Sequence, residues 1–232
     1  MALWHTARAP MECDKQALIE RPVAIPRLVS FNPQLKCKDT YFQFLAVDAV
    51  GQWQSCNNLS QGYTNRTRIG STVHMVSMEV AIEVIWQDAH SVTTTARFMM
   101  FMDRQANNAI PALATMFLST TAAYTAFVQP INFDYLDRFT VLWDKSFSTS
   151  SDYGGSSVGN DPRQLYRYSC PLDETVYYTA NAGTYADISS NTLWAFAVSN
   201  SSTGSVNTQD MNVWVRVLYY VLQTRHKTLS LH

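Results

Sequence analysis

Charged residues are scarce in this chain. Asp, Glu, Lys and Arg make up 15% of its 232 residues, against roughly 25% in typical soluble domains. The formal net charge is −1, which excludes a whole-chain electrostatic attraction to nucleic acid or to an anionic membrane. Low charge combined with abundant Thr, Val, Tyr and Trp favours β-structure. The composition fits a protein whose surface is covered by partners, and it fits a neutral secreted sandwich equally well.

Close cysteine pairs and long apolar runs are also lacking. The four cysteines are scattered, so no metal-binding or redox motif is formed and we expect mostly free thiols: Cys13, Cys37, Cys56 and Cys170. No apolar run is long enough to span a bilayer, so we expect no membrane insertion. The first residues lack the apolar segment of a signal peptide, and we expect none.

Catalytic patterns are weak throughout. Gly155-Ser-Ser-Val-Gly159 matches the nucleophile elbow of hydrolases in letters, but it lies inside a Ser/Gly tract without the strand and helix that the elbow needs. His74 and His90 have no nucleophile near them by spacing. No carboxylate pair or zinc pattern recurs, so we predict a protein that is not an enzyme and has no cofactor. Three loop carboxylates are candidate calcium ligands at a subunit contact, without a ligand pattern: Asp152, Asp161 and Asp187.

The chain divides into an arm, a shell of strands and a short tail. Four prolines indicate an irregular, mildly basic arm over residues 1–38. Segments rich in β-branched and aromatic residues predict a strand domain over 39–224 and a tail over 225–232. We expect eight strands, at 41–49, 71–86, 94–103, 136–145, 163–169, 174–180, 191–199 and 211–222. A short helix begins at Pro111, between the third and fourth of them.

Two of these strands carry the same signature of Arg, Phe, four residues, Asp and a base. The copies run from Arg97 to Arg104 and from Arg138 to Lys145. Side chains alternate in a strand, so Arg and the Asp six residues later share one face. We expect the apolar side chains between them to share the other face: Phe98, Met100 and Met102 in the first copy, and Phe139, Val141 and Trp143 in the second.

Eight strands, one helix and long loops predict an all-β fold, an eight-stranded jelly-roll sandwich. In it we expect the signature strands to lie in opposite sheets and to pack their apolar faces together. Their charged ends are either solvated or placed at a subunit interface, where they would fix register.

The basic residues of the arm are candidates for contacts with nucleic acid phosphates. They are Arg8, Lys15, Arg21, Arg27, Lys36 and Lys38. Three acids, Glu12, Asp14 and Glu20, dilute them, and a solvated terminus is an equal interpretation.

Motifs over residues 59–145 occur in a fixed order. The order is Leu59-Ser-Gln-Gly62, Asn65-Arg-Thr-Arg68-Ile-Gly70, Val73–Val80, Arg97–Asn107, a helix led by Pro111, and Arg138–Asp144. In this order they resemble the small single-jelly-roll capsid proteins of the satellite tobacco necrosis virus type, also found in circular single-stranded DNA viruses. Members usually carry a dense Arg/Lys arm, which this chain lacks.

The resemblance implies self-assembly into a small icosahedral shell around a single-stranded DNA or RNA genome, and a location in the virion. It makes polar residues of the matching motifs candidates for subunit contacts: Arg66, Arg68, Arg97, Asp103, Arg104, Arg138 and Asp144. A glycan-binding β-sandwich module is the alternative, supported by aromatic and Asn-rich loops. A secreted trimeric ligand is less consistent with the missing signal peptide.

Overall fold

The structure is a computed structural model that describes residues 35–86, 95–118, 129–148, 163–201 and 209–221. All of them belong to the unit Pro33–His232. Several predicted features lie outside the described residues: the 155–159 match, the tail, His90, Asp152, Asp161, Arg8, Lys15, Arg21 and Arg27.

The described residues form nine strands and three short helical segments. In chain order these are β1 (Leu35–Val47), β2 (Gln52–Ser55), β3 (Thr72–Trp86), β4 (Thr95–Asp103), α1 (Leu113–Met116), η1 (Phe133–Tyr135), β5 (Phe139–Ser148), β6 (Arg163–Tyr178), η2 (Tyr185–Asp187), β7 (Ile188–Ser190), β8 (Thr192–Ser199) and β9 (Gln209–Val221).

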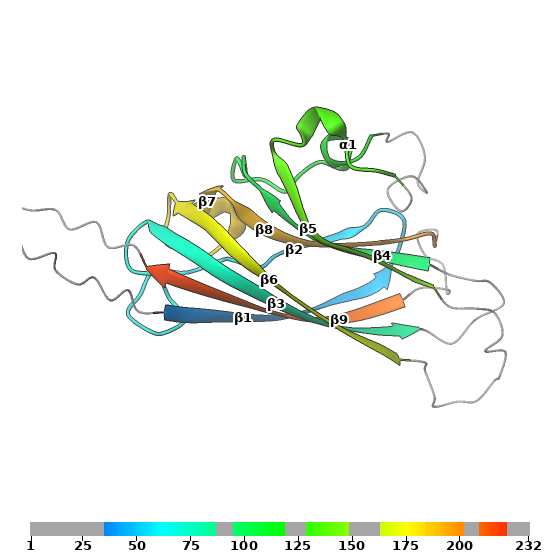
Figure 1. The fold of residues 1–232 in the computed structure, drawn as a ribbon, viewed down its shortest axis with the longest axis horizontal. Coiled ribbons are helices and arrows are strands. Elements are labelled where there is room, and N and C mark those ends of the chain that lie inside the picture. Colours follow the sequence, from blue (N-terminus) through cyan, green and yellow to red (C-terminus); the bar gives the residue numbers. More distant parts are fainter. Residues whose placement is uncertain (1–34, 87–94, 119–128, 149–162, 202–208, 222–232) are drawn as a thin grey trace, which may run out of the picture. The chain divides into compact units, whose positions relative to one another are not determined.

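The strands make two antiparallel sheets, drawn as two layers in Figure 1. Sheet A has the order β1-β9-β3-β6-β7, and sheet B has the order β2-β8-β4-β5. Eight of the nine strands form two interleaved sets of four, with the first and last strands of the chain side by side. This is the jelly-roll arrangement, and the predicted fold class is confirmed.

Strand boundaries differ from the prediction in several places. Strand β6 is one continuous strand where two were expected, at 163–169 and 174–180; a bulge just after Pro171 interrupts its pairing with β3, and proline is tolerated at such a point. Strand β5 begins and ends three residues later than predicted. Strands β2 and β7 were missed because they have only four and three residues. Strand β1 begins at Leu35, so residues 35–38 belong to the sheet rather than to the arm.

The main core lies between the two sheets. Strand β9 alternates strictly between buried and half-buried residues over its whole length, as a strand with one face on a core should. Phe98, Met100 and Met102 of β4 point into this core, as predicted. A second buried cluster lies on the opposite face of sheet B, around Met99 and Phe101, so β4 is buried on both faces.

The two signature strands, β4 and β5, are neighbours in sheet B. The expectation that they lie in opposite sheets is therefore wrong, because alternation along a strand carries no information about which strand pairs with it. A bulge at Leu142 also separates Val141 from Trp143. Because of this extra residue, Phe139 and Val141 pack into the outer cluster while Trp143 packs into the inter-sheet core.

Candidate assembly surface

The signature residues form two reciprocal ion pairs across β4 and β5. The Arg97 guanidinium donates to both carboxylate oxygens of Asp144, at 2.8 and 2.5 Å. Arg138 donates to both oxygens of Asp103, each at 2.8 Å. The two copies run antiparallel, so the arginine of each meets the aspartate of the other. Bidentate geometry of this kind is the strongest that Arg and a carboxylate adopt.

The pair at Asp103 is the more buried of the two. The Asp103 side chain is 0% exposed, and its carboxylate also accepts a hydrogen bond from the Gln105 backbone N–H at 3.0 Å. The hydrogen bond to this carboxylate raises the pKa of the Arg138 guanidinium. The Asp103 carboxylate depends on these donors, because loss of Arg138 would leave a buried charge without its partner.

Residues 104–138, between β4 and β5, form a segment that we call the insertion, and the four charged residues hold its described parts, 104–118 and 129–138. Arg97 also donates to the Gln129 carbonyl at 2.8 Å, and its guanidinium lies 5.6 Å from the ring centre of Phe117. Met116 and Phe117 of the insertion pack on the outer face of sheet B with Phe101. Charge pairs and an apolar cluster therefore fix the described part of the insertion to the sheet.

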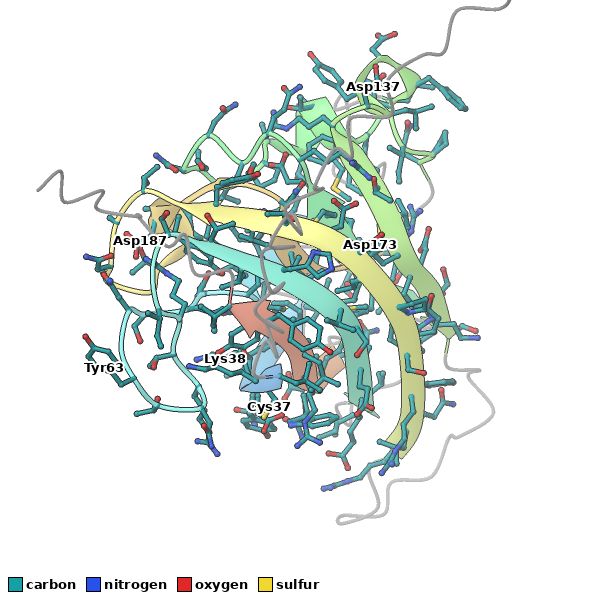
Figure 2. The ribbon with its side chains drawn as sticks, turned by 60° about the vertical axis from the view of Figure 1, so that its left-hand side comes forward. Cys37, Lys38, Tyr63, Asp137, Asp173 and Asp187 are labelled. Atoms are coloured by element: carbon teal, nitrogen blue, oxygen red, sulfur yellow. The ribbon has the colours of Figure 1, made fainter. Side chains whose placement is uncertain are left out.

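The insertion also exposes apolar side chains. Twelve large hydrophobic residues are exposed among the residues that the structure describes, and five of them lie on the insertion: Ile110, Leu118, Phe133, Tyr135 and Leu136. Phe133 is 69% exposed and opens η1, where the Asn132 side chain accepts from the Asp134 N–H at 3.1 Å. Figure 2 shows nearby Asp137 at the outer tip of this segment. A capped turn thus holds Phe133 out toward solvent.

The three remaining interface candidates differ in exposure. Arg66 is exposed on the loop before β3. Arg104 is exposed and pairs with Glu174 at 2.9 Å. Arg68 is 1% exposed, and its guanidinium lies 4.3 Å from the ring centre of Tyr178. These seven residues do not form one cluster, and their role at an interface stays a prediction.

Arg68 is enclosed by backbone carbonyls. Its Nε donates to the Leu59 carbonyl at 3.0 Å, and its terminal nitrogens donate to the carbonyls of Gly70 and Ala180. Burial lowers the pKa of this guanidinium. Within the Asn65–Gly70 motif, Arg68 therefore joins the loop before β3 to the loop after β6.

Lys36 has a similar part at the start of β1. Its side chain is buried, and Nζ donates to the carbonyls of Thr64 and Thr67 at 3.0 and 2.9 Å. The Lys36 ammonium group therefore makes its contacts inside the fold. This disagrees with the prediction that Lys36 belongs to an irregular arm and contacts phosphates. Lys38 is half-buried on the same strand, next to Cys37 (Figure 2).

Metal, thiol and membrane features are few in the described part of the chain. The Asp187 carboxylate accepts from the Gly183 and Thr184 N–H groups at 2.5 and 3.0 Å, so it caps η2. No group of three or more His, Cys, Asp or Glu residues able to hold a metal occurs among the described residues. Cys37, Cys56 and Cys170 are free thiols, and burial raises the pKa of Cys56. No described helix is long and apolar enough to cross a membrane.

The apolar side chains of η1 were missed by the sequence analysis. The signal was present as Ile131-Asn-Phe-Asp-Tyr-Leu136, where apolar and polar residues mix without the period of a helix or a strand. Such a mixture after Pro130 indicates a turn that has no buried face of its own.

Comparisons with known proteins give neighbours of the fold but no family. No protein-family model and no curated protein matches the chain. Among solved structures, Desmodium yellow mottle tymovirus is 8% identical with a TM-score of 0.35, covering 90% of this chain and 99% of that one. The 60-mer BFDV capsid protein is 10% identical with a TM-score of 0.33, covering 84% and 98%. Cucumber leaf spot virus is 12% identical with a TM-score of 0.25, covering 82% and 57%. These neighbours are viral, and values this low do not place the chain in a family.

Proposed function

We propose that this chain is a viral capsid protein that self-assembles into a small icosahedral shell around a single-stranded nucleic acid genome. The observation that carries the proposal is a jelly roll whose four-stranded sheet holds an insertion with five exposed large apolar side chains. The ordered motifs between residues 59 and 145 support it independently.

The exposed residues of the insertion have the chemistry of a subunit interface. Protein interfaces are enriched in Phe, Tyr and other large side chains and depleted in charge at their centre. Phe133, Tyr135 and Leu136 follow one another within four residues and are all exposed. Large apolar residues gathered on one surface segment mark an interaction site. We assign a second copy of this chain as the partner, because a net charge of −1 causes little electrostatic repulsion between two copies.

The reciprocal ion pairs act by positioning in this proposal. They bind the insertion to sheet B within one subunit. The apolar side chains are therefore already in place before subunits associate, and association does not have to order the segment that carries them. Arg66 and Arg104 remain proposed contacts between subunits, since both are exposed. The basic residues of the arm outside the described region, Arg8, Lys15, Arg21 and Arg27, remain proposed contacts with the genome.

The test replaces the two most exposed large apolar residues of η1 and its flank. The double variant Phe133→Asp/Leu136→Asp puts charge at the proposed contact, and we expect particles to be lost and subunits or small oligomers to remain. Leu45→Asp is the control, because Leu45 is comparably exposed on β1; it should assemble like the wild type. Light scattering after size-exclusion chromatography and electron microscopy give the readout. Assembly of the double variant at the wild-type concentration contradicts the proposed surface.

A further inference from the structure

A hollow of about 660 Å³ lies on the outer face of sheet A. The residues that line it are Glu79, Val80 and Ala81 of β3, Arg167, Tyr168 and Ser169 of β6, and Trp214 of β9. The register explains the hollow. Trp214, Ala81 and Arg167 lie in one row across three paired strands, and Glu79 and Ser169 lie in the next row. The small side chains of Ala81 and Ser169 leave the space between the large ones.

The indole at the edge of the hollow is held in place. The Arg216 guanidinium lies 5.0 Å from the ring centre of Trp214, and it donates to both oxygens of Asp39, at 2.8 and 3.3 Å. A planar aromatic surface fixed in this way suits stacking with a flat ligand.

The two charged side chains of the hollow add polar recognition. Arg167 is exposed and has no ion-pair partner among the described residues. Glu79 is exposed too, and its carboxylate can only accept hydrogen bonds when ionised. The hollow therefore offers a stacking surface, one acceptor and a cation, Arg167, for which the described part of the chain supplies no ion-pair partner. Its volume lies within the range of about 300–1,000 Å³ found for small-ligand sites.

We propose that this hollow binds one base of a single-stranded nucleic acid. The base stacks on Trp214, Arg167 contacts a neighbouring phosphate, and Glu79 accepts a hydrogen bond from the exocyclic amino group of the base. This rests on the proposed function, since a shell that encloses a genome presents such a strand at high local concentration. Because a carboxylate accepts from the cytosine amino group and repels the carbonyl of thymine, the hollow prefers cytosine to thymine.

On this face, base stacking contributes more to binding than attraction between basic side chains and phosphates. The outward acids Asp39, Glu79, Glu83 and Asp210 outnumber the outward bases Arg163, Arg167 and Arg216. A face without excess positive charge gives little of the counterion release that drives non-specific binding. Base–aromatic stacking does not require a basic surface, because every base has a flat face.

The experiment measures fluorescence anisotropy of labelled ten-nucleotide strands with the full chain: oligodeoxycytidylate, oligothymidylate and an abasic strand of equal charge. We expect the cytidylate to bind most tightly. Trp214→Ala should weaken its binding about 5- to 150-fold, the range found for loss of one stacked base. Ala81→Leu fills the hollow while keeping every recognising group, so it should weaken binding to a similar extent. Tyr63→Ala, which removes an exposed aromatic on a distant loop (Figure 2), should have no effect.

Two further variants separate the polar roles. Glu79→Gln can both donate and accept, so the preference for cytosine over thymine should disappear. Arg167→Gln should reduce the slope of log affinity against log salt by about 0.7, the value for one phosphate on a single strand. Circular dichroism confirms that each variant keeps its strand signal.

The outcomes separate this site from the proposed function. Particles that form normally while Trp214→Ala and Ala81→Leu bind the cytidylate like the wild type would falsify the hollow but not the shell. If the chain never assembles but binds the cytidylate through Trp214, the proposed shell is contradicted and the proposed base site is supported. If Trp214→Ala stops particle formation without changing strand binding, the hollow is a contact between subunits and the base site is overturned.

Discussion

The outer faces of the two sheets differ in how deeply their ion pairs are buried. On sheet B, Asp103 is buried in its pair with Arg138, and the insertion covers the face. On sheet A, the Arg216–Asp39 and Arg163–Glu83 pairs are partly open to solvent. Figure 1 shows the contrast: α1 lies beyond sheet B, and no described helix or strand lies beyond sheet A.

The two faces are suited to different tasks. Buried bidentate pairs are costly to break and hold one geometry, which suits the rigid support of an interaction segment. Exposed pairs contribute little to stability, so an open face can keep side chains such as Arg167 and Glu79 available to a ligand. The two proposals accordingly assign contacts between subunits to the face of sheet B and contacts with nucleic acid to the face of sheet A.

The largest expected effect comes from breaking the buried pair. Asp103→Ala removes the partner of Arg138 and leaves its guanidinium partly buried without a carboxylate, so we expect a loss of about 3–5 kcal/mol in the free energy of unfolding. Urea denaturation measures this. The double variant Asp103→Leu/Arg138→Met should recover much of the loss, because no unpaired charge remains. The matched change on sheet A, Asp39→Ala, should lower the free energy of unfolding far less. Equal losses at the two sites would contradict the difference between the buried and the exposed pair.

A second contrast, between a buried and an exposed arginine, lies within the Asn65–Gly70 motif. Arg68→Met leaves the carbonyls of Leu59, Gly70 and Ala180 without their donor, and each unsatisfied group costs about 1–3 kcal/mol. We expect thermal unfolding well below the wild-type midpoint. Arg66→Met, two residues away and exposed, should leave the midpoint unchanged. If both variants melt alike, Arg68 is not the residue that joins these loops.

The smallest expected effect concerns acid stability on sheet A. The hydrogen bond from Arg216 lowers the pKa of Asp39 from its ordinary value of 3.8. A depressed folded-state pKa stabilises the fold above the unfolded value, and this stability is lost as the pH falls through the lower folded value. Asp39→Asn should therefore lose slightly less stability than the wild type between pH 4 and pH 2. Thermal midpoints followed by circular dichroism across this range test the sign, and a steeper loss in the variant would contradict it.

Much of the fold was predictable from alternation along single strands. The inward face of β4 follows from residue type alone, and the succession of strands, helix and loops indicated the jelly roll. The partner of each strand did not follow, because pairing depends on register between distant segments. Hence β4 and β5 were placed in opposite sheets, although the repeated Arg and Asp could have suggested an antiparallel pair.

Local irregularities account for other differences. The bulge at Leu142 moves Trp143 into the inter-sheet core, where Tyr168 stacks on it and donates to the Leu142 carbonyl at 2.8 Å. No residue type at Leu142 announces this extra position. The hollow was unpredictable for a related reason, because Trp214, Ala81 and Arg167 come from three strands far apart in the sequence.

Electron microscopy of the purified full chain, over a range of salt concentrations, tests the proposal that this chain builds a closed shell. We expect closed particles of one uniform diameter. A chain that stays monomeric or dimeric at every salt concentration would contradict it.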